Sequence, residues 1–544
     1  MKRGTLLIVA TVALALVVAG AGSGQRTKAG GVFKLGTSSG IDSLNPFVGF
    51  NQDVYATYEY IYPFLVQYDE KTLHFAPDFA LSWKASQGGK VWTFHTRANA
   101  KWSDGQPLTA ADAAWTINTD VKYQATGAAN AAGLIAHIIR AQAPTPTTLI
   151  VRYKEAPGNV LGQFQQLAIL PQHIWSGYTG HKGNDLKTVP DRAPLVSGGP
   201  FTLTKYTKHE IALFARNDSF YGPKPIIDGF GLRMYANDDA MISALEHGEL
   251  DAIETVPPTA IKSLQSAGFA ISATRGLHET DFIVNSNPKK TKRRELLNLK
   301  VREAFAHAID RKQIVNVVYL GHAQPAASFI PPASGRWSNP GLKPETFDLA
   351  LANKILDGLG YKKGSDGIRV AGDHKMVYSV IDPTDVQSVP RTFQIIQTDF
   401  AKIGVKLTLK PLDSSAAFDA ITAPDTKYLD FDLAMWDWTA LVDPDFMLSV
   451  LTCAQYGGWS DTGYCNPAYD KLYSKQQLTP DQDKRRAVVW AMQKKQVQDR
   501  PYIILVYTDW VAAVSKKWAG LSVTGQGPFN ALSKQSLTRV HQTG

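Results

Sequence analysis

The chain has 544 residues, a formal net charge of +9 and only two cysteines. A chain of this length exceeds what one hydrophobic core supports, so we expect two or three lobes. With 44% hydrophobic and 19% charged residues, its composition is that of a globular protein and excludes a disordered or fibrous one. The densest basic run, residues 289–294, has no interleaved aromatic residues, so a nucleic-acid surface is not indicated.

The N-terminus has the pattern of a secretory signal peptide. Lys2 and Arg3 precede an apolar run over residues 6–18, and the small residues at 19–21 fit a cleavage site. The apolar run is shorter than the roughly 20 residues that a membrane-spanning helix needs. We therefore expect an exported protein, in the periplasm or at the extracellular face of the membrane, from which residues 1–21 are removed.

Strands and helices alternate along the rest of the chain. The patterns predict, in order, a strand at 31–36, a strand, turn and helix between 92 and 117, a hairpin at 201–215, a helix at 239–247, a strand at 250–253, and helices at 301–309 and 350–359. Thr109 and Asp112 have the spacing of a capping box at the start of the first of these helices. The alternation indicates α/β lobes with mixed sheets.

Two tryptophans mark a late strand in the stretch AMWDWTALVDPDF. Residues 430–438 alternate, which predicts a strand with Trp436 and Trp438 on one face and Asp437 on the other. Ligands of α/β sheets sit at the carboxyl ends of strands, and two indoles there suit stacking against peptide side chains or sugar faces. Packing beneath the following helix is the alternative for both tryptophans.

The two cysteines, Cys453 and Cys465, flank a segment whose three glycines let the chain double back. In an oxidising compartment we expect a disulfide between them. Closing so short a loop contributes roughly 3 kcal/mol in the chain-entropy model. A metal site is the alternative, but no histidine lies nearby in the sequence and two thiols alone are a poor zinc set.

No catalytic constellation is apparent in the sequence. A nucleophile elbow, a phosphate-binding loop and a zinc-protease motif are absent, and the 12 histidines are scattered without ligand spacing. Asp443 and Asp445 could serve as an acid–base pair, but Asp443 before Pro444 is typical of a helix N-cap followed by its first residue. We therefore predict no enzymatic activity, no cofactor and no metal site.

Several blocks together resemble the family 5 extracellular solute-binding proteins, the oligopeptide and dipeptide receptors of ABC importers. In the family's order they are PDFALSW at 77–83, KWSDGQPLTAAD at 101–112, SGGPF at 197–201, GELDA at 248–252, VREAF at 301–305, AIDR at 308–311 and NPAYD at 466–470. The resemblance implies a two-lobed α/β fold of the periplasmic-binding-protein type (type II), with mixed sheets, an inserted domain and a ligand cleft between the lobes. The implied boundaries are 30–65, 198–285 and 501–544 for lobe I, 66–197 for the inserted domain and 286–500 for lobe II.

The resemblance also implies a receptor that captures its ligand between the lobes and passes it to membrane permease subunits, without catalysis, and we expect it to be a monomer. Trp438 matches the family's late-strand tryptophan and Asn285 its strand-end asparagine. The remaining residues expected to contact ligand are Trp436, Ser39, Gly40, Tyr507 and Trp510. For each of them, structural packing is the alternative.

Two departures from the family pattern bear on function. No lipobox cysteine follows the N-terminal apolar run, so no lipid anchor is expected there. In peptide-binding relatives an aspartate shortly after the tryptophan pairs with the peptide's α-ammonium, whereas residues 440–442 here are Ala, Leu and Val. We expect an oligopeptide ligand. An oligosaccharide or other neutral solute is the alternative for the same fold, and a secreted hydrolase is the alternative from another class.

Overall fold

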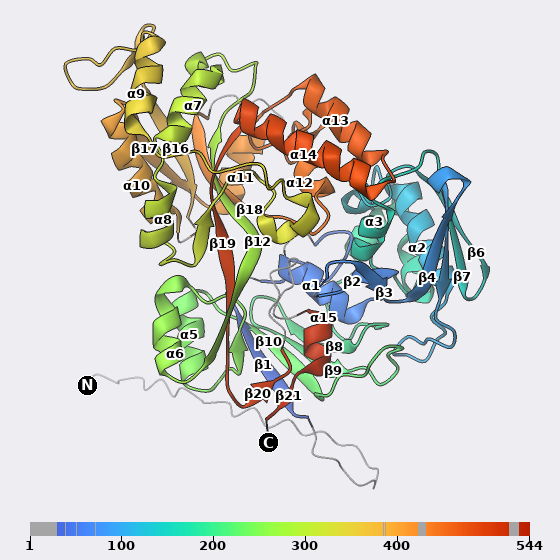
Figure 1. The fold of residues 1–544 in the computed structure, drawn as a ribbon. Helices are drawn as coiled ribbons and strands as arrows, with labels where there is room; N and C mark the ends of the chain where they lie inside the picture. The colour runs from blue at the N-terminus through green and yellow to red at the C-terminus, as the bar shows by residue number, and fades with distance from the viewer. Residues whose placement is uncertain are drawn as a thin grey trace, which may run out of the picture.

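The computed structural model describes residues 30–543 except 39, 50–51, 71, 385, 387, 423–430 and 522–532. The predicted signal peptide and Ser39 lie outside the described residues. Figure 1 shows two lobes joined by long central strands, with a small separate sheet beside the lower lobe. None of the helices in the described part of the chain is long and apolar enough to cross a bilayer.

One mixed sheet runs through both lobes. Its order is β17 (Lys406–Leu412), β16 (Val377–Pro383), β18 (Leu433–Thr439), β12 (Ala270–Val284), β19 (Tyr502–Val514), β11 (Ala252–Ile253), β1 (Val32–Thr37), β10 (Gly229–Met234), β9 (Ile211–Arg216) and β8 (Phe201–Thr207), with β13 (Ala323–Pro325) also paired to β19. The two longest strands, β12 and β19, pair antiparallel and carry the chain between the lobes (Figure 1). Parallel pairs occur in both lobes, β1 with β10 and β16 with β17, so the sheet is mixed as predicted.

Helices flank this sheet in each lobe. The lower lobe carries α5 (Asp238–Glu246) and α6 (Ile261–Ser266), with α1 (Gln52–Ile61) and α15 (Lys534–Arg539) near its centre. The upper lobe carries α7 (Leu299–His307), α8 (Arg311–Val317), α9 (Leu349–Gly358), α10 (Val389–Lys402), α11 (Ser414–Thr422), α12 (Asp445–Ser449), α13 (Pro467–Gln477) and α14 (Gln482–Asp499). Short two-stranded sheets complete the fold: β2 (Val66–Tyr68) with β3 (Phe75–Pro77), β14 (Val370–Ala371) with β15 (His374–Lys375), and β20 (Trp518–Ala519) with β21 (His541–Gln542).

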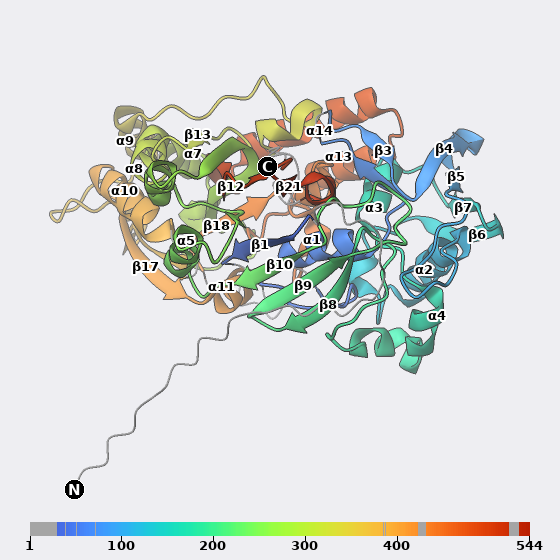
Figure 2. The ribbon, with the colours of Figure 1, turned by 90° about the horizontal axis from the view of Figure 1, so that it is seen from below.

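The small sheet, with its helices, is called the small-sheet domain below. Its strand order is β4 (Ala80–Ser86), β5 (Val91–Thr96), β7 (Thr148–Tyr153) and β6 (Ile138–Thr145), and its helices are α2 (Ala110–Tyr123), α3 (Val160–Gln166) and α4 (Gln172–Trp175). The predicted capping box begins α2, where the Asp112 carboxylate accepts the Thr109 N–H at 2.9 Å. Figure 2 shows this domain and the α9–α10 end of the upper lobe on opposite sides of the molecule.

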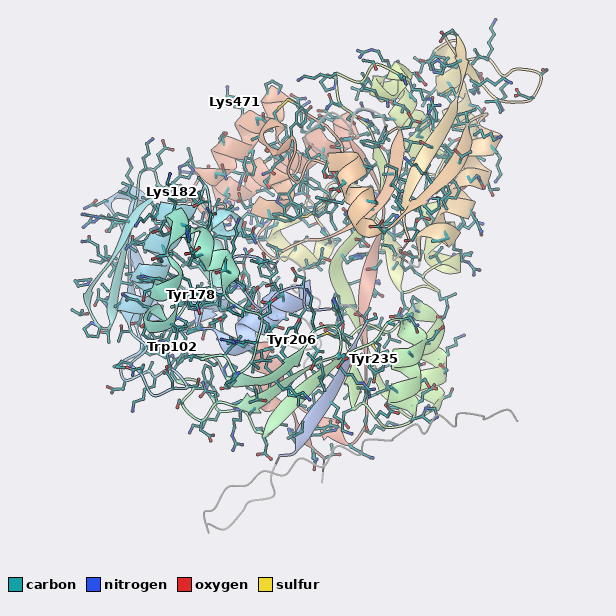
Figure 3. The ribbon with its side chains drawn as sticks, turned by 180° about the vertical axis from the view of Figure 1, so that it is seen from behind. Trp102, Tyr178, Lys182, Tyr206, Tyr235 and Lys471 are labelled. Carbon is teal, nitrogen blue, oxygen red and sulfur yellow. A yellow bond between two sulfur atoms is a disulfide. The ribbon has the colours of Figure 1, made fainter. Side chains whose placement is uncertain are left out.

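The core is divided in the same way as the fold. One cluster of buried side chains, which includes Trp102 (Figure 3), fills the lower lobe and the small-sheet domain, and another fills the outer part of the upper lobe. A third packs on the other face of β18 and includes residues of the segment 326–337 and of α12–α14. Tyr68 and Leu73, from the β2–β3 hairpin, pack against this third cluster. The hairpin therefore ties the upper lobe to the rest of the molecule.

Candidate functional site

The tryptophan-bearing strand β18 lies beside the strand β12 that crosses between the lobes. Their antiparallel register places Trp438 opposite Glu279, Asp437 opposite Thr280 and Trp436 opposite Asp281. Directly opposed residues project from the same face of a sheet. Both tryptophans therefore share a face with two acids, while Asp437 lies on the other face, where it is 3.4 Å from the imidazole of His278. The predicted alternation of this strand is confirmed.

The two tryptophans belong to a group of five rings, called the aromatic cluster here. Trp438 is only 7% exposed, and its ring centroid is 6.0 Å from Phe446 and 6.2 Å from Trp459. Trp436 is half-buried, 6.0 Å from Phe418, and Trp459 is 38% exposed. Trp438 therefore packs against the following helix α12, as the packing alternative expected, and ligand contact by Trp436 and Trp438 stays a prediction.

The disulfide holds the exposed edge of the aromatic cluster. Cys453 and Cys465 are bonded, as predicted, and they close the loop that carries Trp459. Within that loop the Tyr456 hydroxyl donates to the Gly463 carbonyl at 2.6 Å, and the Trp459 ring contacts Phe446 at 5.5 Å. The position of the Trp459 ring therefore depends on a loop that is covalently closed.

A cavity of about 330 Å³ lies where the small-sheet domain and the β2–β3 hairpin meet the upper lobe. Tyr68, Phe75 and Trp92 form part of one wall, and Trp337 and Val442 form part of the other. Its volume is at the lower end of the range for small-molecule sites, and its lining combines aromatic surface with a few polar groups as such sites do. Val442 comes three residues after the end of β18, so the loop that leaves the tryptophan strand reaches this cavity.

A buried ion pair lies at the upper-lobe wall of this cavity. The Arg485 guanidinium, which is fully buried, donates to both carboxylate oxygens of Asp443 at 2.5 and 2.7 Å and lies 4.7 Å from the Trp337 ring centre. Burial lowers the pKa of the Arg485 guanidinium, but the charge and hydrogen bonds of Asp443 raise it by more, so the pKa is raised overall. The predicted helix start needs correction: α12 begins at Asp445, and Pro444 precedes it. Asp443 does accept the Asp445 N–H, but its carboxylate mainly neutralises Arg485.

Three acids lie behind the aromatic cluster, and none of them was predicted. Glu279 and Asp281 are completely buried, and so is Asp461, which accepts the Trp438 indole N–H at 3.1 Å and the Tyr502 hydroxyl. Burial first, and then the neighbouring carboxyls, raise the pKa of Glu279 and of Asp281. Burial raises the pKa of Asp461 to about 7 against the effect of its two donors. The sequence did carry a signal, since HETD places acids at alternate positions directly before the apolar residues that end the strand.

The other predicted residues are placed as follows. Asn285 is buried and donates to the Phe431 carbonyl at 2.8 Å. The Tyr507 hydroxyl donates to the Ser328 carbonyl at 2.6 Å, and Tyr507 lies opposite Glu279 in the β12–β19 register. Trp510 is half-buried on β19, and its indole nitrogen has no hydrogen-bond partner among the described residues. Gly40 is half-buried and is not among the residues that line the cavity beside Trp337. Ligand contact by these residues stays a prediction.

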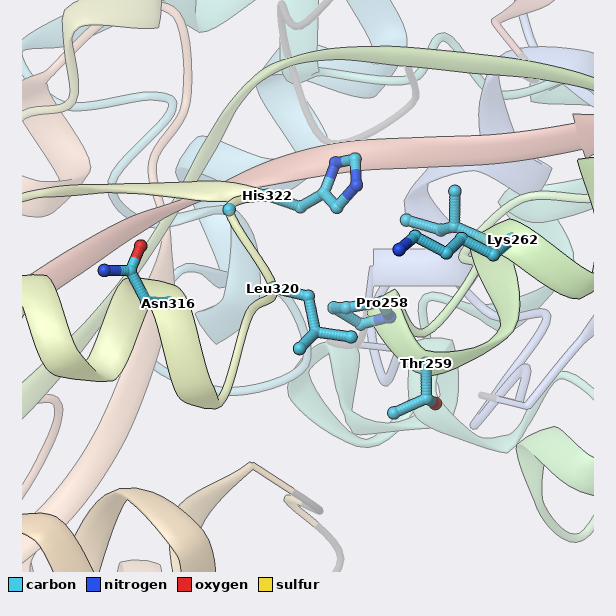
Figure 4. Close-up of a pocket in the computed structure, with 8 residues that line it drawn as sticks. Pro258, Thr259, Lys262, Asn316, Leu320 and His322 are labelled. Carbon is cyan, nitrogen blue, oxygen red and sulfur yellow. The ribbon is translucent and has the colours of Figure 1, made fainter.

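A second cavity, of about 370 Å³, bridges the lobes elsewhere (Figure 4). It lies between the start of α6 and the turn that follows α8, with Lys262 on one side and His322 on the other. Its lining includes the exposed Leu320 and offers no indole, phenol or phenyl ring. Its walls are therefore less suited to enclosing a solute than those of the aromatic-lined cavity beside Trp337.

Residues 74–458 match the family model described as bacterial extracellular solute-binding proteins, family 5 Middle. The chain belongs to this family. It is 26% identical to Protein XP55 of Streptomyces lividans over 514 residues, covering 94% of this chain and 90% of the other. It is 25% identical to a dipeptide-binding protein of Pseudomonas aeruginosa over 523 residues, covering 91% and 92% of the two chains. The predicted family is thus confirmed, over nearly the whole of each relative.

Solved structures show the same fold. The oligopeptide-binding protein AppA of Bacillus subtilis, in complex with a nonapeptide, matches with a TM-score of 0.81 at 20% identity, over 95% of this chain and all of that one. NikZ of Campylobacter jejuni, in complex with Ni(L-His), matches with a TM-score of 0.79 at 19% identity, over 94% of this chain and 99% of that one. The predicted two-lobed α/β fold of this family 5 protein is confirmed.

Proposed function

We propose that this family 5 solute-binding protein captures short peptides and presents them to the permease of an ABC importer, without catalysing a reaction. Relatives support the peptide: the Pseudomonas aeruginosa protein is named for dipeptide binding, and a Brucella ovis relative, 27% identical over 353 residues, is named as a putative ABC transporter peptide-binding protein. The observation that carries the proposal is the aromatic cluster at the end of β18. The loop that follows this strand reaches a cavity whose walls come from the upper lobe on one side and from the small-sheet domain and the β2–β3 hairpin on the other.

Capture follows from the two walls of that cavity. Tyr68 comes from the β2–β3 hairpin and Trp337 from the upper lobe. A solute that touches both walls gains all its contacts only when the walls are together, so it shifts the population toward the closed form. Only the difference in affinity between the closed and open forms drives this shift. The permease then recognises the closed shape.

Within this proposal the predicted residues contact the ligand, and they are Trp438, Trp436, Asn285, Ser39, Gly40, Tyr507 and Trp510. Residues 1–21 direct export, and the mature chain acts as a monomer in the periplasm or at the extracellular face of the membrane. The lobes have the predicted boundaries, 30–65, 198–285 and 501–544 for lobe I, 66–197 for the inserted domain and 286–500 for lobe II.

An oligosaccharide is the second candidate ligand, because indole rings at a protein surface also stack against sugar faces. Isothermal titration of the mature protein with a tetrapeptide mixture and with cello-oligosaccharides separates the two. We expect heat from the peptides and, in small-angle scattering, a smaller radius of gyration when they are present. Heat from the sugars alone would overturn the peptide proposal, and turnover of either ligand would overturn the absence of catalysis.

A further inference from the structure

Two carboxyl groups on the crossing strand β12 have no partner in the described part of the molecule. Glu279 and Asp281 are each 0% exposed, and none of their four carboxylate oxygens makes a hydrogen bond there. The charged groups that act on them are further acids, Asp437 and Asp461, and no lysine or arginine is among them. Burying an acid without a counter-ion or a donor is costly, so a partner from outside the chain is expected.

Other polar and aromatic groups lie on the segments that surround the two acids. Ser460, next to Asp461, is 3% exposed, and its hydroxyl is buried without a hydrogen-bond partner among the described residues. Trp438 lies directly opposite Glu279 on one side, and Tyr507 lies opposite it on the other. The two acids are therefore bordered by aromatic rings. Carboxylates beside ring faces are the arrangement that binds an organic cation, through charge-assisted hydrogen bonds and cation–π contact.

We propose that Glu279 and Asp281 form a subsite for a cationic organic group of the ligand, an amine or a guanidinium. The inference rests on the proposed function, because the cationic group is taken to be part of the solute that the protein captures. No three of the described His, Cys, Asp and Glu side chains are arranged to hold a metal ion, which favours a polyatomic cation. The subsite supplies on β12 the acid that residues 440–442 lack after the tryptophan strand.

Access to the subsite requires movement. Neither carboxyl has exposed surface in this structure, so the cationic group reaches them only when the packing that covers them opens. A receptor that opens before capture and closes afterwards provides that opportunity. The conformation described here is then the one in which the subsite is shut.

Two pairs of matched ligands test the subsite by isothermal titration of the mature protein. One pair is tetraalanine with a free and with an acetylated N-terminus, and the other is phenethylamine and its neutral analogue 2-phenylethanol. We expect the amine of at least one pair to bind about 30-fold more tightly than its neutral partner, as for a buried charge pair. Equal binding of amine and neutral partner by the unmodified protein in both pairs would overturn the inference.

Variants then assign the preference to these residues. In Glu279→Gln with Asp281→Asn we expect the preference for the amine to fall below about 3-fold. Asp120→Asn is the matched control, because Asp120 is an equally buried acid in the small-sheet domain with an unpartnered carboxylate oxygen. It should keep the full preference. Retention of the full preference by the double variant would overturn the inference, and if that variant does not fold, Glu279→Gln alone carries the same test.

Proton release gives a measurement independent of any variant. The titratable groups that act on the two acids are Asp437, Asp461 and the phenols of Tyr502 and Tyr507. Burial and nearby acids raise the pKa of Glu279 and Asp281 and so favour their protonated forms, whereas a bound cation favours their ionised forms, so binding is expected to release protons. We expect the binding heat to differ between phosphate and Tris buffers in the sense of proton release. The same heat in both buffers would count against the subsite.

The outcomes distinguish this inference from the peptide proposal. If free and acetylated tetraalanine bind equally, and phenethylamine binds no better than 2-phenylethanol, the peptide proposal stands and the cation subsite falls. If no peptide binds but phenethylamine binds and depends on Glu279 and Asp281, the subsite stands and the peptide proposal falls.

Discussion

The acids that flank β18 and the acids that lie on β12 are all buried, but they differ in whether a cationic side chain neutralises them. Asp432, just before β18, is paired with the ammonium of Lys290 and the guanidinium of Arg293. Asp443, shortly after β18, is held by both terminal nitrogens of Arg485. Glu279 and Asp281, on the neighbouring strand, have no such partner among the described residues.

The difference separates acids that stabilise the upper lobe through ion pairs from acids that we propose bind a cationic group of the ligand. A buried charge is tolerated when its counter-ion and hydrogen bonds are present, as at Asp432 and Asp443. Where these are missing, the acid is kept neutral or is completed by something outside the chain. Four predictions test this contrast.

The largest effect is expected from Arg485→Met. The change leaves the Asp443 carboxylate buried without its counter-ion, which should lower the free energy of unfolding by about 3–5 kcal/mol in urea titrations. Arg336→Met is the control, because its partner Asp483 is 75% exposed and an exposed pair contributes about 0–1 kcal/mol. Equal losses in the two variants would contradict the structural role given to the buried pair.

The disulfide should contribute somewhat less. Replacing Cys453 and Cys465 together by serine removes the restriction on a 12-residue separation, and we expect a loss of roughly 3 kcal/mol, seen as a lower Tm by calorimetry. Because the loop carries Trp459, tetrapeptide binding should weaken as well. The unmodified protein under reducing conditions is the control and should show the same lower Tm, whereas a variant Tm equal to that of the oxidised unmodified protein would mean that the loop is held by its packing alone.

The sequence predicted the parts of this molecule that depend on local pattern. The alternation around Trp436 and Trp438, the capping box at Thr109 and the disulfide loop all follow from residue spacing, and each is confirmed. Family motifs then supplied the two-lobed fold, which no local pattern could reveal.

What the sequence did not reveal depends on contacts between distant segments. Residue spacing suggested that Asp443 caps a helix. No nearby residue indicates that Arg485, 42 residues later, neutralises its carboxylate. Likewise, Glu279 and Asp461 are brought together only by the pairing of β12 with β18 and the folding of the disulfide loop. Charge pairing across such separations is settled by the tertiary fold.

The unpaired acids should make the ligand-free protein more stable at low pH. A carboxyl whose pKa is raised by folding contributes stability that is present below its ordinary value of about 4 and is lost as the pH rises through the raised value. Burial and the neighbouring acids raise the pKa of Glu279 and of Asp281, so the stability that these two acids contribute is lost as the pH rises above about 4. In Glu279→Gln with Asp281→Asn we therefore expect the Tm at pH 8 to exceed that of the unmodified protein by about 2–4 °C, with little difference at pH 5.

The control for this prediction is Asp239→Asn, which replaces an exposed acid and should leave the pH profile of the Tm unchanged. A double variant that is less stable than the unmodified protein at pH 8 would show that Glu279 and Asp281 have stabilising partners in the ligand-free state. The contrast with Asp432 and Asp443 would then disappear.

The smallest effect is expected at the exposed edge of the aromatic cluster. Trp459→Ala removes a ring that is 38% exposed, so the Tm should change little, while tetrapeptide affinity falls by about 3–10-fold through lost ring contact. Phe347→Ala removes a ring of similar exposure elsewhere in the upper lobe and serves as the control, with unchanged affinity expected. If Trp459→Ala lowers the Tm as much as the loss of the disulfide does while affinity is preserved, the aromatic cluster is core throughout. In that case the ligand is recognised by the acids of β12 without help from the ring at its open edge.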